Sequence, residues 1–158
     1  MLRRGIYFGA MLLSACTMGL EFAHVLEWQP KTHYPAALYV RLQESLYIWF
    51  GNVGSVIYVL AIVASVALAV ALRKERSSRG LVTAAAALEV IALITFLTIV
   101  YPVNLQFPVH GSGAVPAGWA ALRDRWELGH AVGFALFTAA FILLAVNLLR
   151  TPAREPVR

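Results

Sequence analysis

The chain has 158 residues, which is enough for one domain. Hydrophobic residues make up 60% of it and charged residues only 13%, whereas an ordinary soluble domain carries about 25% charged residues. This composition excludes a soluble domain of this size, which could not bury so much apolar surface, and indicates an integral membrane protein. The formal net charge of +5 does not indicate a nucleic-acid partner, because the basic residues fall in short runs between apolar stretches.

Four apolar segments are each long enough to cross a bilayer, which takes about 20 residues of helix. They cover residues 5–25, 36–72, 80–101 and 123–149. None of them alternates between apolar and polar residues as a membrane β-strand would. We therefore predict an all-α protein, a four-transmembrane-helix up-down bundle that forms one domain over residues 1–150. Residues 151–158 are expected to form a flexible cytoplasmic tail.

Lysine and arginine residues are distributed unevenly among the connections. They precede the first segment, separate the second from the third, and follow the fourth. Because loops rich in Lys and Arg remain in the cytoplasm, both termini are predicted to be cytoplasmic in a multi-pass protein of a bacterial inner membrane. An aromatic belt is expected at the opposite, outer boundary, formed by Trp28, Trp49, Tyr101 and Trp119.

Two features of the connections need an explanation. The second segment is longer than a span requires, so it is expected to project from the membrane or to break, with a kink at Gly51–Gly54. The outer connection 102–122 is long and contains several Pro and Gly residues. A loop of this length in a small protein is typical of a lid or a binding loop.

Ionisable residues inside membrane spans are costly and usually face the interior of the bundle. In this sequence they gather near the outer ends of the segments, and the chain reversals bring these ends together. Glu89 is the exception, because it lies about 13 Å into its span at 1.5 Å per residue. The residues concerned are Glu21, His24, Gln43, Glu44, Tyr47, Asn104, Arg123, Arg125, Glu127 and His130.

A repeated spacing is the most informative detail. Glu21 and His24 on the first segment, like Glu127 and His130 on the fourth, are three residues apart and share one helical face. Both histidines lie about one membrane thickness from the cytoplasmic arginines, so they are expected to face each other. Such Glu-x-x-His pairs on two helices, with a Glu from each of the other two, are the ligands of carboxylate-bridged di-metal bundles.

In the metal hypothesis, Glu44 could join the set of Glu21, His24, Glu127 and His130 to hold iron, zinc or copper. Glu89 is too deep to join, which leaves a di-metal set incomplete. This hypothesis has two alternatives. The two histidines could instead ligate a haem from both sides, although the neighbouring acids argue against it. The simplest alternative is that the histidines and acids are interfacial groups bonded to one another and to loop carbonyls.

Four stretches of the sequence resemble the motifs of the anthrone oxygenase-like family of small membrane proteins. They are Glu21–Glu27, Gln43–Tyr47, Pro102–Asn104 and Trp119–His130, and the last is the most specific. Together they extend over all four predicted helices.

The resemblance implies a four-helix bundle whose polar motifs converge at one end. Characterised relatives in polyketide pathways are associated with oxidising an anthrone to an anthraquinone without a bound cofactor, and most members have no assigned activity. Carried over by position, the residues expected to line the site are His24, Asn104, Trp119, Arg123, Arg125, Glu127 and His130.

The leading hypothesis is a membrane oxidoreductase acting on a small lipophilic molecule that enters from the bilayer or under the outer loop. Glu127 or His130 would take a proton from an acidic carbon or a phenol, and Arg123 or Arg125 would stabilise the resulting anion. Oxygen would then react with the carbanion directly or at a metal. The residues expected to bind the substrate are Gln43, Tyr47, Asn104 and Trp119.

The competing hypothesis is a non-enzymatic membrane module, either an accessory subunit or a binder of metal, haem or lipid. It predicts a lipid-facing stripe of small residues, for which the stretches 61–71 and 84–87 are candidates, and it allows a homo-oligomer. The direction of the polar residues distinguishes the two hypotheses. A shared metal site also requires His24 and His130 to lie within about 10 Å of each other, since metal–nitrogen bonds are near 2 Å.

Overall fold

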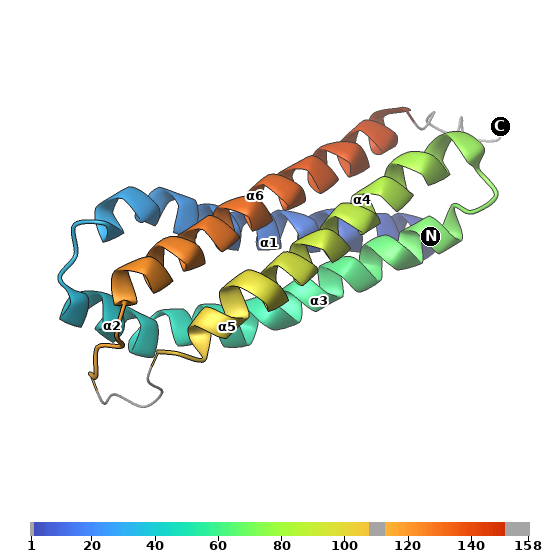
Figure 1. The fold of residues 1–158 in the computed structure, drawn as a ribbon. Coiled ribbons are helices and arrows are strands. Elements are labelled where there is room, and N and C mark those ends of the chain that lie inside the picture. Colours follow the sequence, from blue (N-terminus) through green and yellow to red (C-terminus); the bar gives the residue numbers. More distant parts are fainter. Residues whose placement is uncertain (1, 108–112, 151–158) are drawn as a thin grey trace.

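The structure, a computed structural model, describes residues 2–107 and 113–150, and within these ranges it contains helices and no strand. The elements are α1 (Leu2–Lys31), α2 (Ala36–Ser45), α3 (Tyr47–Ala71), α4 (Arg76–Thr95), the π-helical segment η1 (Phe96–Val100), α5 (Tyr101–Asn104) and α6 (Trp119–Arg150). Four long helical rods, α1, α3, α4–η1–α5 and α6, run side by side (Figure 1). All four are long and apolar enough to cross a membrane, so the prediction of an all-α, four-helix membrane bundle is confirmed.

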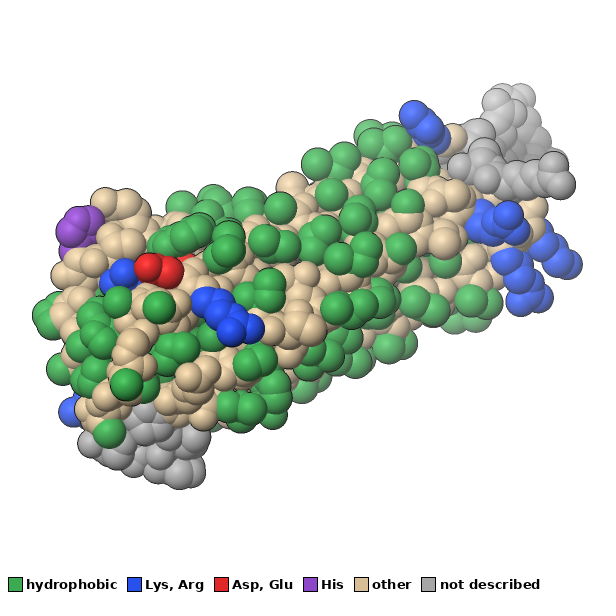
Figure 2. Space-filling view, viewed as in Figure 1, with side chains coloured by type: hydrophobic (Ala, Val, Ile, Leu, Met, Phe, Trp, Pro, Cys, Tyr) green, Lys and Arg blue, Asp and Glu red, His purple; other side chains and the backbone are tan. Residues whose placement is uncertain are grey.

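The two ends of the bundle differ in what they carry. The chain begins at the same end as the connection between α3 and α4, and α6 ends there too; we call this the terminal end (Figure 1). The opposite end, where α1 leads into α2 and α5 leads toward α6, is the site end. Lys and Arg side chains lie at the terminal end, where the sequence predicts them, and others lie at the site end, one of them beside an acidic side chain (Figure 2). The membrane side that each end faces stays a prediction.

The long second segment breaks at a different place from the one expected. It is divided at Leu46 into α2 and α3, and α3 continues without interruption through Gly51–Gly54. Gly54 is a packing position, because a Cβ there would lie 3.4 Å from Leu20 Cδ1 of α1. Contact with a neighbouring helix therefore keeps α3 regular where the sequence suggested a kink.

The other spans are also longer than predicted. Helix α1 continues to Lys31, six residues beyond the expected end, and includes Pro30 in its last turn. The third rod reaches Asn104 through η1, and α6 begins at Trp119. The central part of the predicted lid, residues 108–112, and the predicted tail 151–158 lie outside the described residues.

Small side chains allow the helices to approach one another inside the bundle. Ala10, Ala61, Ala85, Ala92 and Ala140 are all fully buried. Transmembrane helices associate through such small residues, because lipid is as apolar as the side chains it would replace. Of the alanines considered as a lipid-facing stripe, Ala61 and Ala85 are therefore used within the chain, whereas Ala67, Ala71, Ala84 and Ala87 are exposed.

The π-helical segment is accommodated by a glycine on the facing helix. A Cβ on Gly129 of α6 would lie 2.5 Å from Val100 Cγ2 and 3.1 Å from Ile99 Cγ2 of η1. Beta-branched side chains have few alternative rotamers, so these methyl groups cannot easily move away. Gly129 thus sets the distance between α6 and η1.

Replacing Gly129 with Ala is expected to destabilise the bundle by about 1–3 kcal/mol, the usual cost of overpacking. The measurement is reversible unfolding in mixed micelles followed by helical circular dichroism. The matched control is Gly19→Ala, because a Cβ at Gly19 meets nothing within 4 Å. Equal stability of the two variants would contradict the packing role of Gly129.

Candidate functional site

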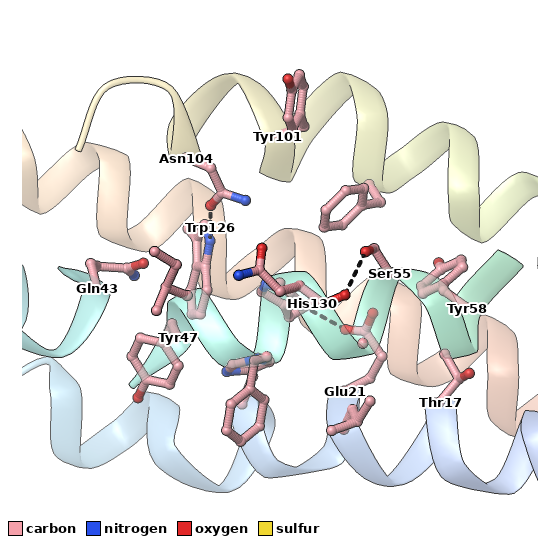
Figure 3. Close-up of a pocket in the computed structure, with 18 of the residues that line it drawn as sticks. Thr17, Glu21, Gln43, Tyr47, Ser55, Tyr58, Tyr101, Asn104, Trp126 and His130 are labelled. Carbon is pink, nitrogen blue, oxygen red and sulfur yellow. Dashed lines mark hydrogen bonds and ion pairs between the residues drawn. The ribbon is translucent and has the colours of Figure 1, made fainter. Parts of the chain in front are cut away.

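A cavity of about 530 Å³ lies between the four rods near the site end. Its volume is within the range of about 300–1,000 Å³ that is usual for small-molecule sites. Glu21 and His24 of α1 line it together with Trp126 and His130 of α6, and Tyr58 of α3 lies further along (Figure 3). The polar residues therefore point into the bundle, which is the arrangement expected for a pocket.

Glu21 and His130 form a buried acid–imidazole pair across α1 and α6. Glu21 Oε2 lies 2.7 Å from His130 Nδ1, and the two residues are 6% and 7% exposed. The other ring nitrogen, His130 Nε2, is buried and has no hydrogen-bond partner among the described residues. A carboxylate that accepts the Nδ1 proton leaves Nε2 as an acceptor, so one nitrogen is oriented and the other is available to a ligand.

A second glycine on α6 makes this pair possible. A Cβ on Gly133 would lie 3.0–3.1 Å from the carboxylate atoms of Glu21. The absence of a side chain at Gly133 therefore creates the space that the Glu21 carboxylate occupies beside His130. Gly133 lies one turn beyond His130, so a single face of α6 carries both the imidazole and the space for its partner.

The two histidines face each other, as their spacing predicted. The ring centroids of His24 and His130 are 4.1 Å apart with the planes at 36°. Trp126 lies edge-on to both rings, with its centroid 4.6 Å from that of His24 and 4.2 Å from that of His130. Tyr47 and Phe50 of α3 complete an aromatic wall around His24. This wall holds both imidazoles in fixed positions.

A buried lysine stabilises the site end beside the histidines. Lys31 is 1% exposed, and its Nζ lies 3.0 Å from Glu27 Oε2 and 3.1 Å from Glu127 Oε1. The ammonium also lies over the rings of Tyr47 and Trp126, at 4.4 and 4.8 Å from their centroids. The Tyr47 hydroxyl donates a 2.6 Å hydrogen bond to Glu27. We call Lys31, Glu27, Glu127, Tyr47 and Trp126 the Lys31 cluster.

Lys31 lies beyond the predicted end of the first segment at residue 25 and is not among the predicted site residues. The signal that could have found it is the spacing of Glu27 and Lys31, which are four residues apart and form an ion pair on one helix face. The presence of Pro30 and the weaker hydropathy after residue 25 favoured an earlier end to the helix. Glu127, predicted as a base or a metal ligand, is buried and forms an ion pair with Lys31.

Neither of the arginines predicted to act on the substrate lines the cavity. Arg123 donates hydrogen bonds to the carbonyls of Lys31 and Thr32 and thus caps the end of α1. Arg125 is exposed and donates a 2.9 Å bond to the carbonyl of Thr98 in η1. Both side chains therefore contact helix ends or irregular backbone, and their action on a substrate stays a prediction.

Three of the four residues predicted to bind substrate lie at the cavity wall and one does not. Gln43, Tyr47 and Asn104 line the cavity, whereas Trp119 packs beside the Arg123 guanidinium and the Tyr39 ring. Asn104 Oδ1 accepts a 2.7 Å hydrogen bond from Trp126 Nε1, which leaves the amide NH₂ group of Asn104 to donate to a ligand. Gln43 donates to the hydroxyl of Tyr39, and burial raises the pKa of that phenol, which keeps it neutral.

The predicted metal ligands are dispersed among different partners. Glu21 pairs with His130, Glu127 with Lys31, and Glu44 accepts a hydrogen bond from the backbone N–H of Gly113. Among residues 2–107 and 113–150, no group of three or more His, Cys, Asp or Glu side chains is placed to hold a metal ion. The arrangement of donors therefore does not fit the di-metal set.

The histidine pair does not fit a haem either. Two imidazoles that ligate one iron from opposite sides place their nitrogens about 4 Å apart, twice a metal–nitrogen bond of about 2 Å, and their ring centroids further apart still. The centroids of His24 and His130 are only 4.1 Å apart. Ring-to-ring contact at this distance leaves no room for a macrocycle between them.

Comparison of the chain with models of protein families, with curated proteins and with solved structures gives no match.

Replacing Lys31 with Met is expected to destabilise the protein by about 3–5 kcal/mol, because it leaves the buried Glu127 carboxylate without a cation. The double variant Lys31→Met/Glu127→Gln should recover part of this loss, and unfolding in mixed micelles measures both. Lys74→Met is the matched control, since Lys74 is exposed at the terminal end. Glu127→Gln alone completes the cycle, and if the loss in the double variant equalled the sum of the losses in the two single variants, the Lys31–Glu127 pair would have no coupling energy and its role here would be refuted.

Proposed function

We propose that the chain is a membrane oxidoreductase of the anthrone oxygenase-like kind that acts on a small lipophilic substrate. The observation that carries the proposal is the buried Nε2 of His130, which has no hydrogen-bond partner in the described part of the chain and whose ring is oriented by Glu21 at the wall of the cavity. An imidazole with one nitrogen bound to a carboxylate and the other free is the arrangement of a general base and its orienting group. A buried polar atom without a partner is costly, and a substrate hydroxyl or acidic C–H would supply that partner.

In the proposed reaction, a methylene next to an aromatic ketone or phenol is oxidised to a carbonyl. His130 Nε2 takes a proton from the methylene, and the carbanion transfers its electrons to dioxygen to form a C–O bond. The histidinium returns the proton to the distal peroxide oxygen. Removal of the second C–H proton breaks the O–O bond and releases water, so that R₂CH₂ and O₂ give R₂C=O and H₂O. Dioxygen is the oxidant, and no further reductant is required.

The surroundings of His130 support the anionic intermediate. The NH₂ group of Asn104 is left free to donate to a substrate oxygen, because the other end of its amide is held by Trp126. The Lys31 ammonium lies behind Trp126, but Glu27 and Glu127 at ion-pair distance balance its charge. Asn104 is therefore the group that would take the role predicted for Arg123 and Arg125.

The inward direction of the polar groups favours this proposal over a partner-binding module. Glu21, His24 and His130 are at most 7% exposed and line one cavity, while buried alanines pack between the helices of the same chain. In this proposal the terminal end with its Lys and Arg side chains faces the cytoplasm. The cavity then lies in the outer half of the membrane.

Substituting His130 with Ala is expected to lower the rate of oxygen consumption with anthrone as substrate by about 10²- to 10⁴-fold, the usual contribution of a general base. The measurement uses purified protein in lipid nanodiscs and an oxygen electrode, with product formation followed by absorbance. His33→Ala is the control, because His33 lies exposed in the turn after α1. An unchanged rate in His130→Ala would refute the role of this histidine.

Elemental analysis of protein purified without a His-tag separates direct reaction with oxygen from reaction at a metal. Because the predicted ligands have other partners, we expect an active preparation with far less than one metal ion per chain. A stoichiometric metal content, with activity lost on chelation and restored by the same metal, would favour the metalloenzyme version instead.

A further inference from the structure

The cavity is lined on one side by residues that also face outward from the bundle. Gly51, Asn52 and Ser55 of α3 are exposed, and all three line the cavity. They lie within about 6–12 Å of the start of this span at 1.5 Å per residue, on a helix that is otherwise strongly apolar. A small or polar surface on such a helix costs free energy in contact with lipid tails, so this surface requires an explanation.

The opposite side of the same opening is formed by the third rod. Leu97 of η1 and Tyr101 of α5 line the cavity while remaining 50% and 46% exposed. Val59 of α3, 49% exposed, lines the cavity one turn beyond Ser55. The cavity is therefore open sideways between α3 and the η1–α5 part of the third rod. We call this opening the lateral opening.

The inner end of the cavity has a different character from the lateral opening. Glu21, His24 and His130 are nearly inaccessible, and Glu21 and His130 lie on the side of the cavity formed by α1 and α6 (Figure 3). The buried His130 Nε2 and His24 Nδ1 atoms have no hydrogen-bond partners among the described residues. A ligand that fits both ends of the cavity must have a polar, hydrogen-bonding group at the inner end and an apolar group where the opening meets lipid.

We propose that the lateral opening admits an amphiphile from the bilayer, with its hydroxylated aromatic head at the Glu21–His130 pair and its apolar tail passing between α3 and η1 into the lipid. The tail need not fit inside the cavity, whose volume is that of a drug-sized head group. Each methylene of the tail also favours the membrane over water. The substrate class is thus a tailed phenol or hydroquinone that remains anchored in the bilayer. This inference rests on the proposed function only for the chemistry at the head.

The test measures binding alone, with Trp126 as the reporter, because its indole lines the cavity. Trp28, Trp49 and Trp119 are replaced with Phe, and the single-tryptophan protein is placed in lipid nanodiscs. The probes are a decyl-substituted bromophenol, whose bromine quenches indole fluorescence and whose hydroxyl can donate to His130 Nε2, and the same bromophenol with a methyl group instead of the decyl chain. The concentration of each probe is expressed per volume of membrane. The stronger partitioning of the decyl probe into lipid is then not mistaken for tighter binding to the protein.

The lateral opening is closed by Gly51→Phe, since Gly51 is exposed at the cavity lining and a Cβ there meets nothing within 4 Å, which leaves room for a ring at the opening. Gly19→Phe on α1 is the matched control, because Gly19 is also exposed and unobstructed but does not line the cavity. Ser55→Phe is a second closing variant, in case Gly51→Phe reduces helical content measured by circular dichroism.

We expect saturable quenching by the decyl probe, a half-saturation concentration raised at least about tenfold by Gly51→Phe or Ser55→Phe, and a change below about twofold for Gly19→Phe. The proposal is overturned if the closing variants behave like Gly19→Phe, if the methyl probe binds as tightly as the decyl probe, or if the decyl probe does not bind. Tail-dependent binding through this opening, together with no oxygen consumption in the anthrone assay, would refute the proposed reaction and leave the lateral route standing.

Discussion

Lys31 is a cation with almost no access to solvent, and much of the site end is arranged around it. Burying an ammonium costs several kcal/mol unless acids accompany it, so Glu27 and Glu127 must lie within ion-pair distance. This requirement fixes α1 against α6. His24 lies two turns before Lys31, and His130 lies one turn after Glu127 on the antiparallel helix. With the long lysine side chain bridging the remaining distance, the ion pair holds the two imidazoles in contact.

The sequence predicts the architecture well because the signals for it are local. Apolar length, the distribution of Lys and Arg and the Glu-x-x-His spacing all follow from helix geometry, which tertiary contacts seldom override in a membrane span. The meeting of His24 with His130 belongs to this class of prediction. What the spacing could not decide is which acid serves which base. Glu21 pairs across the bundle with His130, whereas Glu127 beside it serves Lys31.

The features missed by the sequence analysis depend on contacts between distant segments. Arg123 and Arg125 belong to the same motif as His130, and their sequence does not distinguish a substrate-binding arginine from one that caps α1 or holds η1. The π-helical segment η1 likewise has no clear local signal. The residue that accommodates η1 is Gly129 on the facing helix, and the need for a glycine at this position can be recognised only from the contact between the two elements.

A comparison of two buried groups shows why the cavity, rather than polarity alone, identifies the site. Glu89 is fully buried in the middle of α4, where the Ser14 hydroxyl donates a 2.6 Å hydrogen bond to it, and it does not line the cavity. Because Glu89 does not line the cavity, its contact with Ser14 of α1 can be purely structural. His130 combines an unsatisfied nitrogen, a fixed ring and a space large enough for a small molecule. Departures from complete hydrogen bonding are expected at functional sites, and at His130 such a departure adjoins a cavity that a substrate can enter.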